Sequence, residues 1–270
     1  MGRIDFGAIK AIALDLDGVV YEGNHAIPGA AESIGSFSQL GLEVFPITNN
    51  STRTREETQQ KLKDFQIYLP ISNIFTSSYV AAHFLRNHRN QGGSVLVIGE
   101  NGLVQEILRQ DLHVCQTPPA QTLVVGLDRE FSYTKICNGL AVLQQGAFFL
   151  ACNRDKHYPG EKGELKPGCG SMVAAIEAVA SRKVDIEIGK PNPYMLRIIQ
   201  GLGAYQPREI LVIGDSVESD IAMANAFGCP SILLCRENIA HIAQVPDRVV
   251  PDYVMSTLVD VINLFHNSDN

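Results

Sequence analysis

The chain has 270 residues, of which 45% are hydrophobic and 19% are charged, and its formal net charge is −7 at pH 7. This length is enough for one large domain or two moderate ones. The negative balance, with no cluster of lysine or arginine, argues against binding of a nucleic acid or an anionic membrane. No apolar run reaches the roughly 20 residues of a transmembrane helix, and we expect a cytoplasmic protein.

Segments with the patterns of strands and helices alternate along nearly the whole chain. In chain order, the predicted strands span residues 11–16, 43–48, 94–99, 122–127, 147–152, 209–216 and 231–235. The predicted helices span residues 30–40, 54–65, 77–86, 103–109, 133–145, 171–180, 195–200, 219–227 and 254–265. Residues 153–169 are expected to form a polar loop with Gly and Pro. This alternation favours parallel sheets covered by helices on both faces, which is the α/β class.

The first predicted strand poses a charge problem. It ends in DLDGVVY, residues 15–21, which places Asp15 and Asp17 beside a segment suited to burial. Burying one unpaired carboxylate is costly, and two close carboxylates also repel each other. The pattern therefore predicts a counter-charge at this point, and a metal ion is the simplest one.

Three further polar clusters stand where strands or turns end. They are Thr48-Asn49-Asn50-Ser51, Gly189-Lys190-Pro191, and Gly214-Asp215-Ser216 with Asp220 beyond. Each alone is typical of a helix cap or a turn. Ligands of open α/β sheets bind at the carboxyl ends of the strands, so together the clusters predict one site.

Phosphoryl transfer is the chemistry that these residue types suit. Oxygen ligands favour Mg²⁺, which would let Asp15 and Asp215 lie close together. Asp15 can act as a nucleophile, and Asp17 can protonate the leaving oxygen and later deprotonate water. Gly18 would leave backbone amides open to the phosphate, and Lys190 would balance its charge. Two further phosphate-binding candidates come from the second cluster, namely Thr48 and the amide of Asn49, with Asn50 beside them.

The four clusters resemble, in this order, the signature motifs of the haloacid dehalogenase superfamily of phosphohydrolases. The longer patterns DGVVYEGNHAIPGA, VVGLDREFSYTKICNGLAVLQQGAFFLACNRDKHYP and PGCGSM resemble one branch of it. That branch contains p-nitrophenyl phosphatases, ribonucleotide monophosphatases, phosphoglycolate phosphatases and pyridoxal phosphate phosphatases. The resemblance implies a Rossmann-like parallel-sheet core domain, residues 1–80 and 187–270. It also implies an inserted α/β cap domain, residues 81–186.

The resemblance also implies a role for each matching residue. Asp15 corresponds to the nucleophile and Asp17 to the general acid/base. The Mg²⁺ ligands would be Asp15, the backbone carbonyl of Asp17, and Asp215, with Asp220 orienting metal-bound water. Asp at position 17 is typical of phosphatases and counts against a dehalogenase.

The cap loop departs from the Asn-Pro-Asp of many relatives, because this chain has Asn153-Arg154-Asp155. That loop faces the leaving group in relatives, so the substrate cannot be carried over. The candidates for substrate specificity are Asn153, Asp155, Lys156 and His157, and an ordinary polar loop is the alternative for each.

These observations predict a Mg²⁺-dependent phosphomonoesterase that acts on small organic monophosphates through an aspartyl-phosphate. The expected partner is a small-molecule phosphate ester, with neither a nucleic acid nor a membrane, and a homodimer is left open. The alternatives are a phosphomutase of the same superfamily and a non-enzymatic sensor of phosphate esters.

Overall fold

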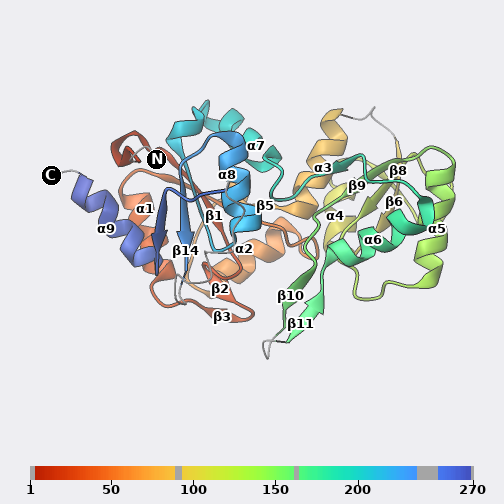
Figure 1. Cartoon of the computed structure of the whole chain (residues 1–270), viewed down its shortest axis with the longest axis horizontal. Coiled ribbons are helices and arrows are strands. Elements are labelled where there is room, and N and C mark those ends of the chain that lie inside the picture. The colour runs from red at the N-terminus through yellow and green to blue at the C-terminus, as the bar shows by residue number, and fades with distance from the viewer. Residues whose placement is uncertain (1–3, 89–92, 161–163, 236–248, 269–270) are drawn as a thin grey trace. The chain divides into compact units, whose positions relative to one another are not determined.

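A computed structural model describes residues 4–88, 93–160, 164–235 and 249–268. The chain divides into two compact units. The core unit comprises Met1–Thr48, Gln59–Ile74 and Lys190–Asn270, and the inserted unit comprises Asn49–Thr58 and Phe75–Gly189. Each unit combines a parallel sheet with helices, which confirms the predicted fold class of an α/β core with an inserted α/β cap (Figure 1).

The larger sheet has six strands in the order β15-β14-β13-β1-β4-β5. The strands are β1 (Ala11–Asp15), β4 (Glu43–Thr48), β5 (Phe75–Thr76), β13 (Ile210–Gly214), β14 (Ser231–Leu234) and β15 (Tyr253–Met255). The pairs from β15 to β4 are parallel. All five residues of β1 and of β13 are buried, as expected for strands covered on both faces.

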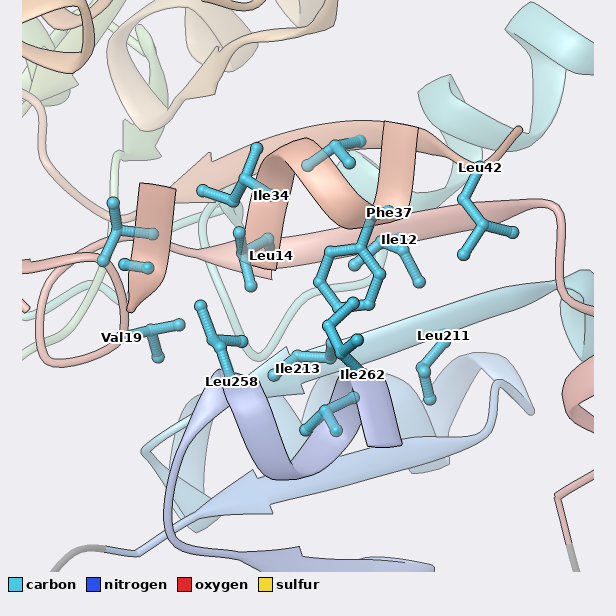
Figure 2. Packing of buried hydrophobic residues seen from close by; sticks show 14 of the residues in the cluster. Ile12, Leu14, Val19, Ile34, Phe37, Leu42, Leu211, Ile213, Leu258 and Ile262 are labelled. Carbon is cyan, nitrogen blue, oxygen red and sulfur yellow. The ribbon is translucent and has the colours of Figure 1, made fainter. Parts of the chain in front are cut away.

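One face of this sheet packs on α1 (Ala30–Gln39) and α9 (Leu258–Ser268). Figure 2 shows side chains of β1 and β13 meeting those of the two helices. The residues labelled there are Ile12, Leu14, Val19, Ile34, Phe37, Leu42, Leu211, Ile213, Leu258 and Ile262. Because strand side chains alternate in direction, Ala11 and Ala13 point to the opposite face. The remaining core helices are α7 (Tyr194–Gly203) and α8 (Ala222–Phe227), and α2 (Arg55–Asp64) spans the division between the units.

The inserted unit has a five-stranded parallel sheet in the order β12-β9-β8-β6-β7. Its strands are β6 (Ser94–Ile98), β7 (His113–Cys115), β8 (Thr122–Val125), β9 (Phe148–Ala151) and β12 (Ile186–Glu187). Its helices are α3 (Ser77–His88), α4 (Asn101–Leu108), α5 (Tyr133–Gln144) and α6 (Cys169–Ala180). Among the residues that the structure describes, no helix has both the length and the apolar character needed to cross a membrane.

Short elements complete the fold. A hairpin of β2 (Tyr21–Glu22) and β3 (His25–Ala26) follows β1, and a second hairpin pairs β10 (His157–Pro159) with β11 (Leu165–Pro167). The 3-10 turns are η1 (Phe6–Ala8), η2 (Ile71–Asn73) and η3 (Pro207–Glu209), and η4 (Val217–Ile221) is a π-helical turn.

Two predicted elements were wrong. Residues 153–169 are not wholly loop, because they contain β10, β11 and the start of α6. The last helix starts at Leu258 rather than at residue 254, and Tyr253–Met255 is a strand. The physical reason is a cap: the Thr257 hydroxyl accepts from the Asp260 N–H at 3.2 Å, and the Asp260 carboxylate accepts from the Thr257 N–H at 3.0 Å. This reciprocal pair fixes the start of α9.

The domain boundaries at residues 80/81 and 186/187 stay a prediction, and contacts divide the chain elsewhere. Residues 49–58, 75–80 and 187–189 group with the inserted unit. Residues 49–58 do so because the Arg55 N–H donates to Glu106 of α4 at 2.6 Å and Ser51 Oγ accepts from the Leu127 N–H at 2.8 Å. The segment also packs tightly on α4, since a Cβ at Gly102 would lie 2.3 Å from the Thr52 carbonyl oxygen.

The core packing generates a stability prediction. Phe37 is fully buried and its ring contacts Phe265 edge-on, with centroids 5.8 Å apart. Phe37→Ala should lower the free energy of unfolding by about 3–5 kcal/mol, because the cavity adds to the lost burial. Leu40→Ala, at the exposed end of the same helix, is the matched control and should cost below about 1 kcal/mol in the same urea titration. Equal losses would show that this cluster is not the core.

Candidate active site

The predicted site residues of the core unit gather at strand ends of the larger sheet. Asp15 is the last residue of β1, Thr48 is the last residue of β4, and Asp215 directly follows β13. Because β1 lies between β13 and β4 and all three are parallel, these ends share one edge of the sheet. This edge is where open α/β sheets bind ligands.

A buried lysine joins two of the acids. Lys190 Nζ donates to Asp15 Oδ1 at 2.6 Å and to Asp220 Oδ1 at 2.7 Å, and all three side chains are buried. Carboxylate oxygens of Asp15, Asp215 and Asp220 all lie within 4.8 Å of one another. Lys190 thus supplies one positive charge against three carboxylates.

The pKa values report this imbalance. Burial raises the pKa of the Asp15 carboxyl well above its usual range, and the charge of Asp220 raises it further. Burial and Asp220 also raise the pKa of Asp215 to about 6, although that side chain keeps contact with solvent. Burial opposes the charge on Lys190, but Asp15 and Asp220 outweigh it and raise the lysine pKa. The cluster therefore lacks positive charge, and its oxygen donors fit a hard divalent cation such as Mg²⁺.

Asp220 is held from both of its oxygens. It lies on the π-helical turn η4, where the Ser216 N–H donates to Asp220 Oδ2 at 3.2 Å while Lys190 holds Oδ1. Gly214 leaves the room for this carboxylate, because a Cβ there would lie 2.2 Å from Asp220 Cγ. Because both of its oxygens already accept hydrogen bonds, the Asp220 carboxylate is better suited to orient a metal-bound water than to bind a metal ion directly.

The turn after β1 exposes Asp17. The N–H of Val20 donates to the Leu16 carbonyl at 2.8 Å, and the N–H of Gly18 donates to the Tyr21 carbonyl at 2.8 Å. If the Gly18 N–H binds phosphate as predicted, it has to share its hydrogen with the Tyr21 carbonyl. Gly18 serves a different need in the structure: its φ is +82°, and a Cβ there would lie 1.9 Å from Asp215 Oδ2. The turn can pass beside Asp215 only because residue 18 has no side chain.

The second cluster divides between the two units. Thr48 is buried at the end of β4, whereas Asn49 and Asn50 group with the inserted unit. Asn49 Nδ2 donates to both carboxylate oxygens of Asp155, at 3.1 and 3.2 Å. Asn50 Oδ1 accepts from the N–H and the hydroxyl of Thr52, both at 2.8 Å, so it shapes the turn.

The four specificity candidates differ in exposure. Asn153 is buried, and its Nδ2 donates to the Asn49 carbonyl at 2.7 Å. Asp155, Lys156 and His157 are exposed, and His157 begins β10. Ser77, which sequence reasoning missed, also donates its hydroxyl to the Asn49 carbonyl at 2.7 Å. A serine at the start of a predicted helix is typical of an N-cap, so nothing in the local sequence indicated this contact with Asn49.

Arg154 was also missed as a structural residue. Its guanidinium donates to Glu177 on α6, at 2.5 and 3.1 Å, and to Glu187 on β12. Lys183 pairs with Glu177 as well, at 3.0 Å. The Arg154 hydrogen bonds, against the effect of burial, lower the pKa of Glu177 to about 2. Arg154 thus links the base of the loop to α6 and β12.

Comparisons with known proteins assign the family. The sequence model of the haloacid dehalogenase-like hydrolases matches residues 12–113, and a related model of HAD-like hydrolases matches residues 187–261. The sugar-phosphatase AraL of Bacillus subtilis is 32% identical over 254 residues, which cover 94% of this chain and 92% of that protein. The chain belongs to the haloacid dehalogenase-like hydrolases.

Other relatives of this hydrolase carry phosphatase names. The ribonucleotide monophosphatase NagD of Escherichia coli K12 is 28% identical, with 94% of this chain and 99% of that protein covered. The solved structure of a p-nitrophenyl phosphatase from Archaeoglobus fulgidus matches with a TM-score of 0.89 and 26% identity, covering 95% of this chain and 99% of that one. The hydrolase is a phosphatase, as the sequence predicted.

The approach of Gly18 to Asp215 generates a test. In this hydrolase, Gly18→Ala should lower kcat/KM for p-nitrophenyl phosphate by about 100-fold or more, because the new Cβ displaces the Asp215 carboxylate. Gly23→Ala is the matched control: its φ is also positive, at +55°, but nothing lies within 4 Å of a Cβ. It should cost only about 1 kcal/mol of stability. Equal loss of activity in both variants would mean that backbone strain, not crowding of Asp215, is responsible.

The Arg154–Glu177 pair generates a pH prediction. The pKa of Glu177 is lower in the folded protein than in the unfolded chain, so the pair stabilises the fold above about pH 4.5 and its contribution falls as pH decreases toward 2. Glu177→Gln should therefore destabilise the hydrolase by about 1–3 kcal/mol at pH 7, because it weakens the hydrogen bonds from Arg154. Urea unfolding at several pH values should show the difference from wild type shrinking below about pH 4.5. A difference that is constant with pH would contradict the assigned charge.

Proposed function

We propose that the protein is a Mg²⁺-dependent phosphomonoesterase that hydrolyses small organic monophosphates through an aspartyl-phosphate on Asp15. The single observation that carries this proposal is the cluster at the end of β1, where Lys190 Nζ lies 2.6 Å from Asp15 Oδ1 and carboxylates of Asp215 and Asp220 lie beside them. The names of the relatives support the same substrate class, since they include a sugar phosphatase and a ribonucleotide monophosphatase.

In the first step, the carboxylate of Asp15 attacks phosphorus. Lys190 holds Oδ1, which leaves Oδ2 for the attack and keeps the carboxylate in one orientation. A bond forms between Asp15 and phosphorus while the bond from phosphorus to the ester oxygen breaks. Asp17, which is exposed two residues further on, gives its proton to the leaving oxygen.

In the second step, water attacks the phosphorus of the aspartyl-phosphate. Asp17 is now a carboxylate and takes a proton from this water, and the bond between Asp15 and phosphorus breaks to release phosphate. The ammonium of Lys190 lies against Asp15 throughout and offsets the charge of the phosphoryl oxygens. Asp220, held on both oxygens, keeps Lys190 in place.

Mg²⁺ would be held by the carboxylates of Asp15 and Asp215 and by the backbone carbonyl of Asp17. The support is the donor set, since a carboxylate group with raised pKa values gains most from a cation. When bound, the ion screens the negative charge between the carboxylates and the incoming phosphate. Thr48, Asn49, Asn50 and the turn at Asp17 and Gly18 are the proposed phosphate-binding residues.

The inserted unit is proposed to act as a cap that sets the choice of substrate. Its exposed loop residues Lys156 and His157 are the specificity candidates that exposure supports. For Asn153 and Asp155, contacts with Asn49 point to another role. We also place the enzyme in the cytoplasm, because no disulfide links cysteines among the residues that the structure describes, as is usual in reducing compartments.

The proposal predicts turnover of p-nitrophenyl phosphate that needs Mg²⁺ and Asp15. EDTA should abolish hydrolysis and added Mg²⁺ should restore it, because the carboxylates need a cation. Asp15→Asn should remove turnover, since an amide cannot attack phosphorus, and Asp17→Asn should lose about 10²–10⁴-fold.

Asp64→Asn removes the same charge from an exposed position on α2 and is the matched control, expected to keep wild-type turnover. Release of p-nitrophenol with time gives the rate, and circular dichroism checks the fold of each variant. More than about a tenth of the wild-type rate in Asp15→Asn would refute the covalent mechanism, and full activity in metal-free buffer would refute the metal requirement.

A further inference from the structure

Asn49, Asn153 and Asp155, all in the inserted unit, form a closed set of hydrogen bonds. Asn153 Nδ2 donates to the Asn49 carbonyl at 2.7 Å, and Asn153 Oδ1 accepts from the Asp155 N–H at 3.0 Å. The Asp155 carboxylate in turn accepts from Asn49 Nδ2 at 3.1 and 3.2 Å. The loop is thus hydrogen-bonded to both the backbone carbonyl and the side-chain amide of Asn49.

This set fixes both the backbone and the side chain of Asn49. Its carbonyl accepts two hydrogen bonds of 2.7 Å, from Asn153 and from Ser77, which uses both lone pairs and fixes the peptide plane. Its side-chain amide faces a carboxylate, which can only accept, so Nδ2 points to Asp155 and Oδ1 points away. Burial of Asn153, with 4% of its surface exposed, makes the loss of its bonds costly.

Gly189 packs on the same residues. A Cβ at Gly189 would lie 2.4 Å from the Cys152 carbonyl oxygen, 2.5 Å from Asn49 Oδ1 and 3.1 Å from Asn153 Cβ. Gly189 precedes Lys190 in the chain, and Asn49 follows Thr48. Gly189 and Asn49, each next in the chain to a proposed phosphate-binding residue, therefore both lie against Asn153.

The loop that carries Asn153 and Asp155 is hydrogen-bonded to the start of α6. The N–H of Gly168 donates to the Lys156 carbonyl at 2.8 Å, and the N–H of Gly170 donates to the Asp155 carbonyl at 2.9 Å. A Cβ at Gly168 would lie 2.2 Å from the Asp155 carbonyl oxygen. The start of α6 thus fixes the backbone of the loop by hydrogen bonds. A loop with a fixed backbone is suited to position the side chains that it contacts.

We propose that Asn153 and Asp155 are positioning residues that act through Asn49 on the binding of the phosphoryl group, rather than contacts to the leaving group. This inference rests on the proposed function, because it assigns Asn49 to the phosphate. The sequence predicts that these two residues select the substrate. The inference assigns them instead to the binding of the phosphoryl group, which all the substrates share.

Inorganic phosphate separates the two roles, because it has the phosphoryl oxygens and no leaving group. A residue that positions Asn49 should affect the inhibition constant of inorganic phosphate and kcat/KM for every ester in parallel. A residue that contacts the leaving group should change the ratios of kcat/KM between esters and leave phosphate inhibition as it was.

The variants are Asp155→Ala, Asp155→Asn and Asn153→Asp. Asp155→Ala removes the acceptor for Asn49 Nδ2, and should lower kcat/KM about 10- to 100-fold on each ester and raise the phosphate inhibition constant similarly. Asp155→Asn keeps one acceptor oxygen and should recover much of the loss. Asn153→Asp keeps the acceptor for the Asp155 N–H but replaces the donor to the Asn49 carbonyl by an oxygen, and should be at least as severe as Asp155→Ala.

Lys166→Ala is the matched control, since Lys166 lies on β11 of the hairpin that follows this loop and its ion pair with Glu164 is exposed. It should behave as wild type. Thermal melting checks the fold, and Asp155 is exposed, so its variants keep the test decisive if Asn153→Asp unfolds. The esters are p-nitrophenyl phosphate, a sugar phosphate and a ribonucleotide.

A uniform loss across the esters with weaker phosphate inhibition supports the inference. Changed ratios between esters with unchanged phosphate inhibition would overturn it, as would wild-type constants in Asp155→Ala. Failure of the proposed function is distinct from both, because the wild-type enzyme itself would then lack Mg²⁺-dependent hydrolysis.

Discussion

The buried ammonium of Lys190 is the constraint on which the site depends. It lies between the carboxylates of Asp15 and Asp220, and removing it would leave two acids without compensation in the interior. Such a loss costs several kcal/mol, so position 190 is constrained by folding as well as by its proposed catalytic role. The same pair of contacts keeps one oxygen of Asp15 engaged, and in the proposed mechanism it leaves the other oxygen for the substrate. Stability and reactivity are thus served by a single geometry.

Glycines give the acids their room. Asp220 lies over Gly214, and Asp215 lies beside Gly18, at distances that no Cβ would allow. The charged cluster is therefore built by removing side chains next to it as much as by adding acids. Gly18 of the first motif thus makes room for Asp215 of the last motif, and Gly214 makes room for Asp220.

Local patterns made the fold class and the core of the site predictable. The strand that ends in Asp15, the strand that ends in Thr48 and the turn with Asp215 are each short, contiguous signals, and parallel topology brings their ends together. The hydrogen bond between Asn153 and Asn49 was not predictable, because the two residues are 104 positions apart in the chain. Arg154 likewise finds Glu177 and Glu187 only after folding. The hairpin of β10 and β11 escaped notice because each strand has three residues, too few for a period to show.

The grouping of residues 49–58 with the inserted unit bears on how such units can be exchanged between related enzymes. A segment cut at residues 81–186 would leave behind the backbone N–H that Glu106 binds, the Ser51 hydroxyl that Leu127 binds, and the first turn of α3. The transferred unit would then lack the backbone N–H that binds the buried Glu106 carboxylate and the hydroxyl that binds the Leu127 N–H. Modular shuffling of this unit has to move two separate stretches of chain at once, and gene fusion at a single pair of junctions transfers an incomplete module.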